Sequence, residues 1–164
     1  MRNENVKWLA INAMVAAVYA VWTIALAPIS YGNIQFRLSE MMVLLAFVNR
    51  KYIPGLVIGC FLANMLSPIG YLDVIFGTLA TWLAVELVAR TKNIWIASLW
   101  PTLVNAIVIG ILLNVQADIP LWIAMAEVGF GEFVVVTVVG VALFKGVILK
   151  HSKIRPLVTN LKAD

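Results

Sequence analysis

Five acidic residues lie within otherwise apolar stretches of the sequence: Glu40, Asp73, Glu86, Glu127 and Glu132. Ionisable groups are costly in hydrocarbon, so an acid within an apolar stretch is a candidate functional group by default. Glu86 has a simpler explanation, because Arg90 follows four residues later and the two can form an ion pair along a helix. The other four carboxyl groups are therefore the candidates for binding chemistry.

A single cation, Arg37, accompanies these four acids in the outer half of a six-span arrangement of the chain. A pocket with this lining would suit a ligand that carries a cation or several N–H donors, and it would repel a carboxylate or a phosphate. Arg37 itself has two interpretations. It either contacts ligand or pairs with Glu40, three residues on, and anchors the start of a helix. Both stay open, and for Glu40 a ligand role is favoured.

Amides and one aromatic ring at similar depth extend the candidate set. Asn64 and Asn105 could bind a ligand or could bridge helices. Trp82 could stack on a planar ring, and it lies deeper than the interfacial position at which tryptophan usually anchors a helix. The predicted substrate-binding residues are Arg37, Glu40, Asn64, Asp73, Trp82, Asn105, Glu127 and Glu132.

Recognisable catalytic, metal-binding and nucleotide-binding motifs are absent from the sequence. It contains no P-loop pattern, and its only histidine, His151, lies in a basic tail, which excludes zinc-protease and His-based metal motifs. The single cysteine, Cys60, lies in an apolar run and is expected to be a buried apolar side chain. We therefore predict a chain without catalytic residues, metal or cofactor, which is not an enzyme.

Membrane-spanning helices are the elements that must position these side chains. Hydrophobic residues make up 63% and charged residues 12% of the 164 positions. Soluble domains average ~45–50% and ~25%, so the soluble, disordered and fibrous classes are excluded. A span needs ~20 apolar residues, which leaves room for five or six spans and for no soluble domain. The predicted fold is an all-α integral membrane protein, a six-transmembrane-helix bundle in one domain covering 1–164.

Six apolar segments separated by proline, glycine and charged residues predict the helices. Their approximate ranges are 8–27, 38–48, 53–66, 72–89, 94–114 and 119–149. The second is short for a span, so five crossings with a re-entrant segment is the alternative. The first is too long for the apolar part of a signal peptide and has no clear cleavage site, so we expect it not to be cleaved.

The distribution of lysine and arginine supports six crossings. With six spans, eleven of the twelve cations fall on one side of the membrane and only Arg37 on the other. The positive-inside rule then predicts a multi-pass protein of the cell membrane with both termini in the cytoplasm. The net charge of +4 therefore reflects topology in a lipid bilayer and does not indicate nucleic-acid binding.

Small residues repeat along the first predicted helix. Ala10, Ala13, Ala17 and Ala20 are spaced by three, four and three residues, which places them on one helical face. Small side chains let another helix approach closely within lipid. By itself, the spacing favours packing inside the bundle over contact with another subunit.

Three stretches of the sequence resemble the QueT family of membrane proteins. They are 31–40 (YGNIQFRLSE), 58–64 (IGCFLAN) and 73–81 (DVIFGTLAT). The likeness extends from the alanine-rich first helix to Gly131 and Glu132. The combination of the Q-F-R-x-S-E and D-x-I-F-G runs is fairly specific to this family.

QueT proteins are substrate-binding S components of energy-coupling factor (ECF) transporters and are associated with queuosine precursors. The resemblance implies six helices, a pocket open to the outside, and two kinds of partner: a transmembrane coupling subunit and a pair of cytoplasmic ATPases. It implies as substrate the prequeuosine base (preQ1), a deazaguanine with an aminomethyl group, which would suit the carboxylate-rich lining. The family's A-x-x-x-A motif falls on Ala13 and Ala17, with Ala16 and Ala20 as a second register. The resemblance implies that this face docks the coupling subunit, whereas the spacing by itself favours packing inside the bundle.

Two other functions stay open on the sequence alone. The chain could be an S component for a different vitamin or metabolite. It could also be a structural or assembly subunit of a membrane complex that binds no ligand.

Overall fold

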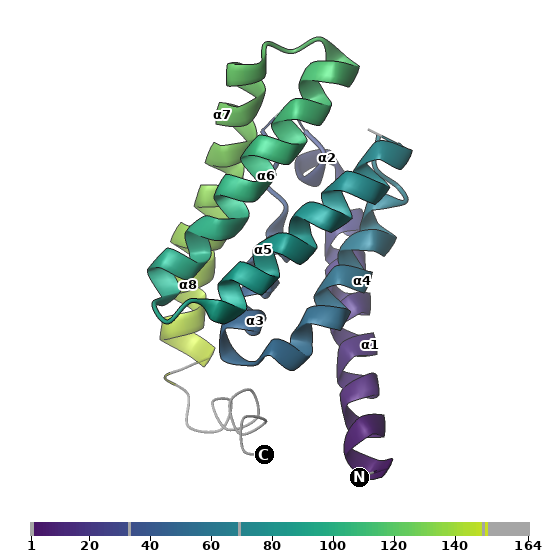
Figure 1. Ribbon diagram of the computed structural model, residues 1–164, viewed down its shortest axis with the longest axis vertical. Coiled ribbons are helices and arrows are strands. Elements are labelled where there is room, and N and C mark those ends of the chain that lie inside the picture. The colour runs from purple at the N-terminus through teal and green to yellow at the C-terminus, as the bar shows by residue number, and fades with distance from the viewer. Residues whose placement is uncertain (1, 33, 69, 149, 151–164) are drawn as a thin grey trace.

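The computed structural model describes residues 2–32, 34–68, 70–148 and 150, and every regular element within them is helical (Figure 1). The predicted all-α fold class is confirmed for this part of the chain. Asn33 and the tail from His151 to Asp164, including three of the cations used to orient the chain, lie outside the described residues.

The first half of the chain forms three helical segments and a short turn of helix. They are α1 (Arg2–Ala25), the turn α2 (Ala27–Ser30), the 3-10 helix η1 (Leu38–Leu44) that continues as α3 (Leu45–Val48), and η2 (Arg50–Tyr52) leading into α4 (Ile53–Asn64). Proline in the first turn of α2 and of α4 suits these helix starts, because the first backbone N–H groups of a helix have no partner within it.

The second half forms three helical segments. They are the π-helical η3 (Asp73–Gly77) continuing as α5 (Thr78–Arg90), α6 (Ile94–Ala117), and a segment made of α7 (Leu121–Glu132), η4 (Phe133–Gly140), α8 (Val141–Leu143) and η5 (Phe144–Ile148). In Figure 1, α6 and α7 run side by side and α5 crosses the front of the molecule.

Three of the described helices are long and apolar enough to cross a membrane: Glu4–Ala25, Ile94–Ala117 and Leu121–Ile148. Leu38–Val48 is a shorter apolar helix. The α-helical parts of α4 and α5 hold 12 and 13 residues, fewer than the ~20 that an upright span needs. The count of six crossings and the orientation of the termini stay predictions.

Glycines allow the closest helix pairs to form. In α4, Gly59 faces α1, where a Cβ would come within 2.8 Å of Tyr19 Cβ and 3.0 Å of Ala16 Cα. In α6, Gly110 faces α7, where a Cβ would come within 2.6 Å of Met125 Cγ. Close approach through small residues is the usual way in which helices pack in lipid.

The alanines of α1 divide between buried and exposed positions. Ala16 and Ala20 are buried against the bundle, whereas Ala10, Ala13 and Ala17 are exposed. Ala20 lies within roughly 20° of Ala13 around the helix axis, so these two differ in burial because the bundle covers α1 at the level of Ala20 and leaves it open at the level of Ala13. Ala13 and Ala17, the two positions of the A-x-x-x-A motif, are both exposed.

The short segment 38–48 lies inside the bundle. Elements η1 and α3 contact α1, α4, α5, α6 and η4, and Val43 and Leu44 are fully buried. A segment surrounded by other helices can be shorter than a span, since protein rather than lipid covers its backbone. This placement brings Arg37 and Glu40, at its start, among the other helices.

Candidate functional site

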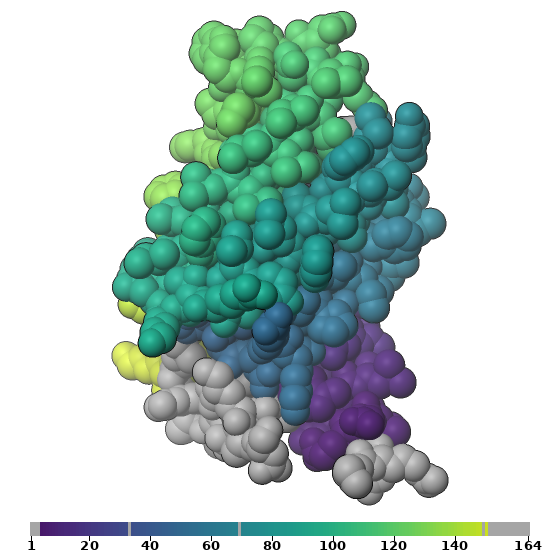
Figure 2. Space-filling view, in the orientation of Figure 1, coloured from purple at the N-terminus to yellow at the C-terminus, as the bar shows by residue number. Residues whose placement is uncertain are grey.

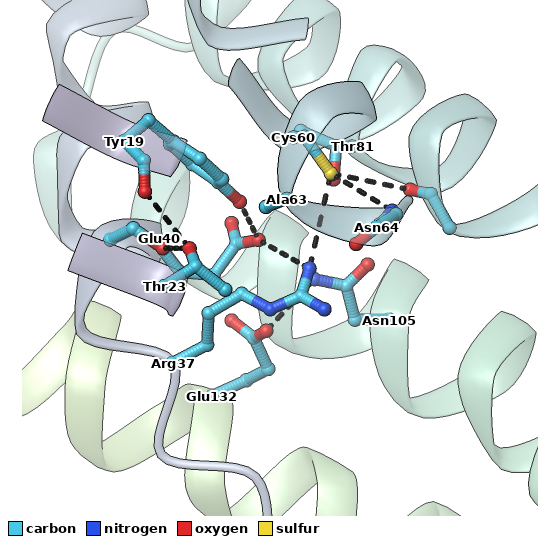
Figure 3. Close-up of polar contacts among 12 residues, drawn as sticks. Tyr19, Thr23, Arg37, Glu40, Cys60, Ala63, Asn64, Thr81, Asn105 and Glu132 are labelled. Carbon is cyan, nitrogen blue, oxygen red and sulfur yellow. Dashed lines mark hydrogen bonds and ion pairs between the residues drawn. The ribbon is translucent and has the colours of Figure 1, made fainter. Parts of the chain in front are cut away.

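Buried polar side chains from every long helical segment meet inside the bundle, and we call them the polar cluster (Figure 3). Its members are Tyr19 of α1, Arg37 and Glu40 at the start of η1, Cys60 and Asn64 of α4, Asp73 of η3, Thr81 of α5, Asn105 of α6 and Glu132 of α7. Each is no more than 7% exposed. Polar groups so deeply buried in a membrane protein are costly unless they are partnered, which makes this place the candidate functional site.

Arg37 connects carboxylates from two segments. Its Nη1 lies 3.7 Å from Glu40 Oε1 and its Nη2 lies 3.8 Å from Asp73 Oδ2. The pair with Glu40 is the local one that the sequence allowed. The contact with Asp73 joins η1 to η3, so Arg37 does more than anchor the start of its own helix.

Glu40 is held by a hydrogen bond from the Tyr19 hydroxyl as well as by Arg37. One turn further along α1, Thr23 Oγ1 lies 2.6 Å from Ser39 Oγ. Two adjacent residues of η1 are thus bonded to α1. Glu40 thus has two partners, Tyr19 and Arg37, whereas Asp73 and Glu132 each keep one side-chain oxygen without a hydrogen bond.

Cys60 is buried in the hydrophobic core, as expected, and its thiol also contacts polar atoms. Its Sγ is 3.1 Å from Thr81 Oγ1, and Asn64 Nδ2 donates to it at 3.3 Å and to the Asp73 carbonyl oxygen at 3.1 Å. Gly77 leaves room for this arrangement, because a Cβ there would collide with the Asp73 carboxylate and come within 2.9 Å of Asn64 Nδ2.

Glu132 forms the opposite wall of the cluster. Its Oε1 accepts a hydrogen bond of 2.9 Å from Asn105 Nδ2. In Figure 3 the Arg37 side chain extends between Glu40 and Glu132. Three carboxyl groups and one guanidinium therefore meet in the cluster, and two of these carboxyl groups, those of Glu40 and Asp73, form ion pairs with Arg37.

Two of these acids lie where a helix widens. Asp73 begins the π-helical η3, and Glu132 is the residue directly before the π-helical η4. A π-helix has i→i+5 hydrogen bonds, is rare, and occurs frequently at functional sites. The local backbone at both acids therefore differs from the plain α-helices that the apolar sequence predicts.

Four buried atoms of the cluster have no hydrogen-bond partner among the described residues. They are Arg37 Nε, Asn64 Oδ1, Asp73 Oδ1 and Glu132 Oε2. Buried polar groups in native proteins are nearly always satisfied, so an unsatisfied set in one place indicates a ligand or bound water. The set consists of three acceptor oxygens and one N–H donor.

A hollow of about 220 Å³ lies next to the cluster, lined by Tyr31, Gly32, Gln35, Pro68, Leu113, Gln116 and Ala117. Tyr31 separates it from the cluster, with the Arg37 guanidinium carbon 5.5 Å from its ring centre. The Tyr31 hydroxyl donates to the Ala63 carbonyl oxygen at 2.6 Å. Burial raises the pKa of Tyr31, with nearby Arg37 opposing, so this hydroxyl stays a donor at neutral pH.

Two predicted site residues lie away from the cluster. Trp82 is 51% exposed, because it lies roughly 100° around α5 from the buried Thr81. Glu127 is half-buried and forms no ion pair within the described residues; it lies roughly 140° around α7 from Glu132. The other six predicted residues all lie in the cluster.

Tyr19, Cys60 and Thr81 were not among the predicted site residues. Tyr19 lies in the middle of an apolar segment, whereas tyrosine in membrane proteins usually lies at the interface. The depth argument that selected Trp82 would have selected Tyr19. Cys60 and Thr81 carry no comparable sequence signal, since both types are common in apolar helices.

Comparison with known proteins identifies the family. The family described as QueT transporter matches residues 9–148. A relative from Lactococcus lactis subsp. cremoris (strain MG1363), described as "Queuosine precursor transporter QueT", is 51% identical over 71 residues, which are 42% of this chain and 41% of that protein. The match thus spans about two fifths of the relative's length. No solved structure shows a significant match. Because the family match covers most of the chain, the resemblance seen in its motifs is confirmed, and the chain belongs to the QueT transporter family.

Proposed function

We propose that this chain is the substrate-binding S component of an ECF transporter. In this proposal it crosses the membrane six times with both termini in the cytoplasm and captures a queuosine precursor from the outside. A transmembrane coupling subunit and two ATPases supply the energy. Family membership and the partial likeness to a relative named for queuosine precursor transport support it.

The observation that carries the substrate proposal is the set of unpartnered atoms in the polar cluster. Asn64, Asp73 and Glu132 each offer an acceptor oxygen, and Arg37 offers one N–H. A guanine-like edge is complementary to this set, because its ring N–H and amino group donate and its exocyclic oxygen accepts. An aminomethyl cation would also be attracted by the carboxylates of the cluster.

Roles within the site follow from how well each group is already bonded. Asp73 and Glu132 keep one free oxygen each and are proposed to accept from the base and its amine. Glu40, bonded to Tyr19 and Arg37, is proposed to hold the arginine in place. Trp82 and Glu127 have no role in this proposal because they lie away from the cluster.

Binding of preQ1 to the purified protein tests the substrate. We expect saturable binding that unlabelled preQ1 displaces, and a deazaguanine without the amine to bind at least about thirtyfold more weakly. Absence of saturable binding at micromolar ligand, in protein shown to be folded, would refute the substrate. Displacement by riboflavin, thiamine or biotin would instead indicate an S component for another metabolite.

The outer face of α1 is the proposed docking surface for the coupling subunit. The N-terminal part of α1 extends past the other helices (Figure 1). Exposed Ala13 borders a groove of about 530 Å³ between α1 and α4, which also includes Ala16, Pro54 and Ile58. Exposed alanines next to a groove allow a partner helix to approach closely.

Tryptophan at Ala13 or Ala17 should abolish docking without affecting the polar cluster. We expect copurification with the coupling subunit and ATPases to fall at least about tenfold, because an indole blocks close helix approach. Val18→Trp is the matched control, since this exposed residue lies roughly 100° around the helix from Ala17. All three variants should bind preQ1 normally. Copurification of Ala13→Trp and Ala17→Trp at the wild-type level would refute this docking face.

A further inference from the structure

A second hollow lies on the outer surface of α5, away from the polar cluster. It has a volume of about 240 Å³ and is lined by Arg50, Trp82, Leu83, Glu86, Leu87 and Arg90. Arg50 belongs to η2 and the other residues to α5. Figure 1 places α5 across the front of the molecule, and its atoms form part of the surface in Figure 2.

Two arginines share one carboxylate in this hollow. Glu86 Oε2 lies 2.5 Å from Arg50 Nη2 and 3.5 Å from Arg90 Nη2. The arginine side chains are 61% and 69% exposed, whereas that of Glu86 is 18% exposed. One positive charge is left uncompensated. Each guanidinium also keeps several N–H groups directed away from Glu86, since it has five.

The rest of the hollow is apolar and exposed. Trp82 is 51% and Leu83 49% exposed. In a helix that lies in a membrane, such side chains face lipid, and tryptophan favours the boundary between acyl chains and headgroups. The hollow thus combines a basic end with an apolar wall along the same helix.

We propose that this hollow binds an anionic phospholipid, with the headgroup phosphate on Arg50 and Arg90 and an acyl chain along Trp82 and Leu83. Both Nη2 atoms approach the same Glu86 oxygen, so they are close enough together to bind one phosphate group. Arginine suits phosphate because its planar N–H groups match the oxygens in pairs. Basic residues next to an apolar helix attract anionic lipid for the same electrostatic reason. The surplus charge gives the preference for phosphatidylglycerol over a zwitterionic lipid.

The test is retention of lipid by the purified full-length protein, measured by native mass spectrometry with phosphatidylglycerol and phosphatidylcholine as probes. We expect preferential retention of phosphatidylglycerol, and Arg90→Gln to weaken it about fivefold. This variant removes the surplus charge and leaves the closer Arg50–Glu86 pair intact. Lys145→Gln is the matched control, because this exposed lysine stands over the Trp95 ring, 5.1 Å from its centre, and does not line the hollow.

Glu86→Gln gives a second test, in which phosphatidylglycerol retention should change in the opposite direction. It removes the carboxylate that competes with phosphate and should increase phosphatidylglycerol retention. Equal losses in Arg90→Gln and Lys145→Gln, or equal retention of the two lipids, would overturn the proposal. Displacement of the lipid by millimolar inorganic phosphate would identify a site for free phosphate instead. Loss of copurification with the ATPase module in Arg90→Gln would identify a protein contact, which also overturns it.

Discussion

Replacing Glu132 with glutamine is expected to weaken preQ1 binding at least about thirtyfold while the protein keeps its fold. Glutamine has the same shape, and its amide oxygen can still accept the hydrogen bond from Asn105 Nδ2 that Glu132 Oε1 accepts at 2.9 Å. The change falls on Oε2, the atom without a partner among the described residues. There an acceptor becomes an NH₂ donor, which faces the N–H groups of the ligand.

Glu127→Gln is the matched control for this experiment. It makes the same chemical change on the same helix, at a half-buried acid that lies away from the cluster. Calorimetric titration should give a Kd within about twofold of the wild type for Glu127→Gln. Thermal unfolding should show Glu132→Gln to be no less stable than the wild type, since glutamine keeps the hydrogen bond from Asn105. Weakened binding in Glu127→Gln with normal binding in Glu132→Gln would place the ligand elsewhere on α7.

Most of the cluster could be predicted because charge in an apolar segment is a strong signal. Arg37, Glu40, Asp73 and Glu132 stand out in stretches that contain few other charges, and burying them without function would be costly. The structure brings these residues together from three different segments: η1, η3 and α7. What the sequence could not predict was which way each helix faces.

Helix rotation explains the predicted residues that lie elsewhere. Trp82 and Glu127 were selected by depth, and depth alone does not distinguish the inside of a bundle from its lipid-facing surface. Their neighbours Thr81 and Val128 are buried, and one residue turns a helix by roughly 100°. Hydropathy gives little help here, because a helix in lipid is apolar on every side.

The alanines of α1 illustrate the same difficulty. The 3-4-3 spacing predicted one face, yet Ala20 packs inside and Ala17 is exposed. The deciding contact is made by Gly59, whose missing side chain lets Ala16 approach α4. A glycine on another helix, 43 positions later in the sequence, thus determines which alanines are free for a partner.

Loss of the Arg37 guanidinium should produce the largest loss of stability. Arg37→Met keeps an unbranched apolar stem but removes the positive charge that lies 3.7 Å from Glu40 and 3.8 Å from Asp73. Both carboxylates are no more than 1% exposed, so neither can be solvated by water instead. Breaking a buried ion pair on one side costs about 3–5 kcal/mol, which corresponds to a fall in Tm of roughly 6–20 °C.

Two further variants separate this charge effect from the loss of side-chain volume. Arg90→Met makes the same substitution at an arginine whose side chain is 69% exposed, and it should lower Tm by about 2 °C or less. Combining Arg37→Met with Glu40→Gln should recover part of the lost stability, because the double variant no longer buries Glu40 as an unpaired charge. Thermal unfolding of all four proteins in one detergent measures the comparison. If Arg37→Met were no less stable than Arg90→Met, or if the double variant were less stable than Arg37→Met, the guanidinium would not be what compensates the buried acids.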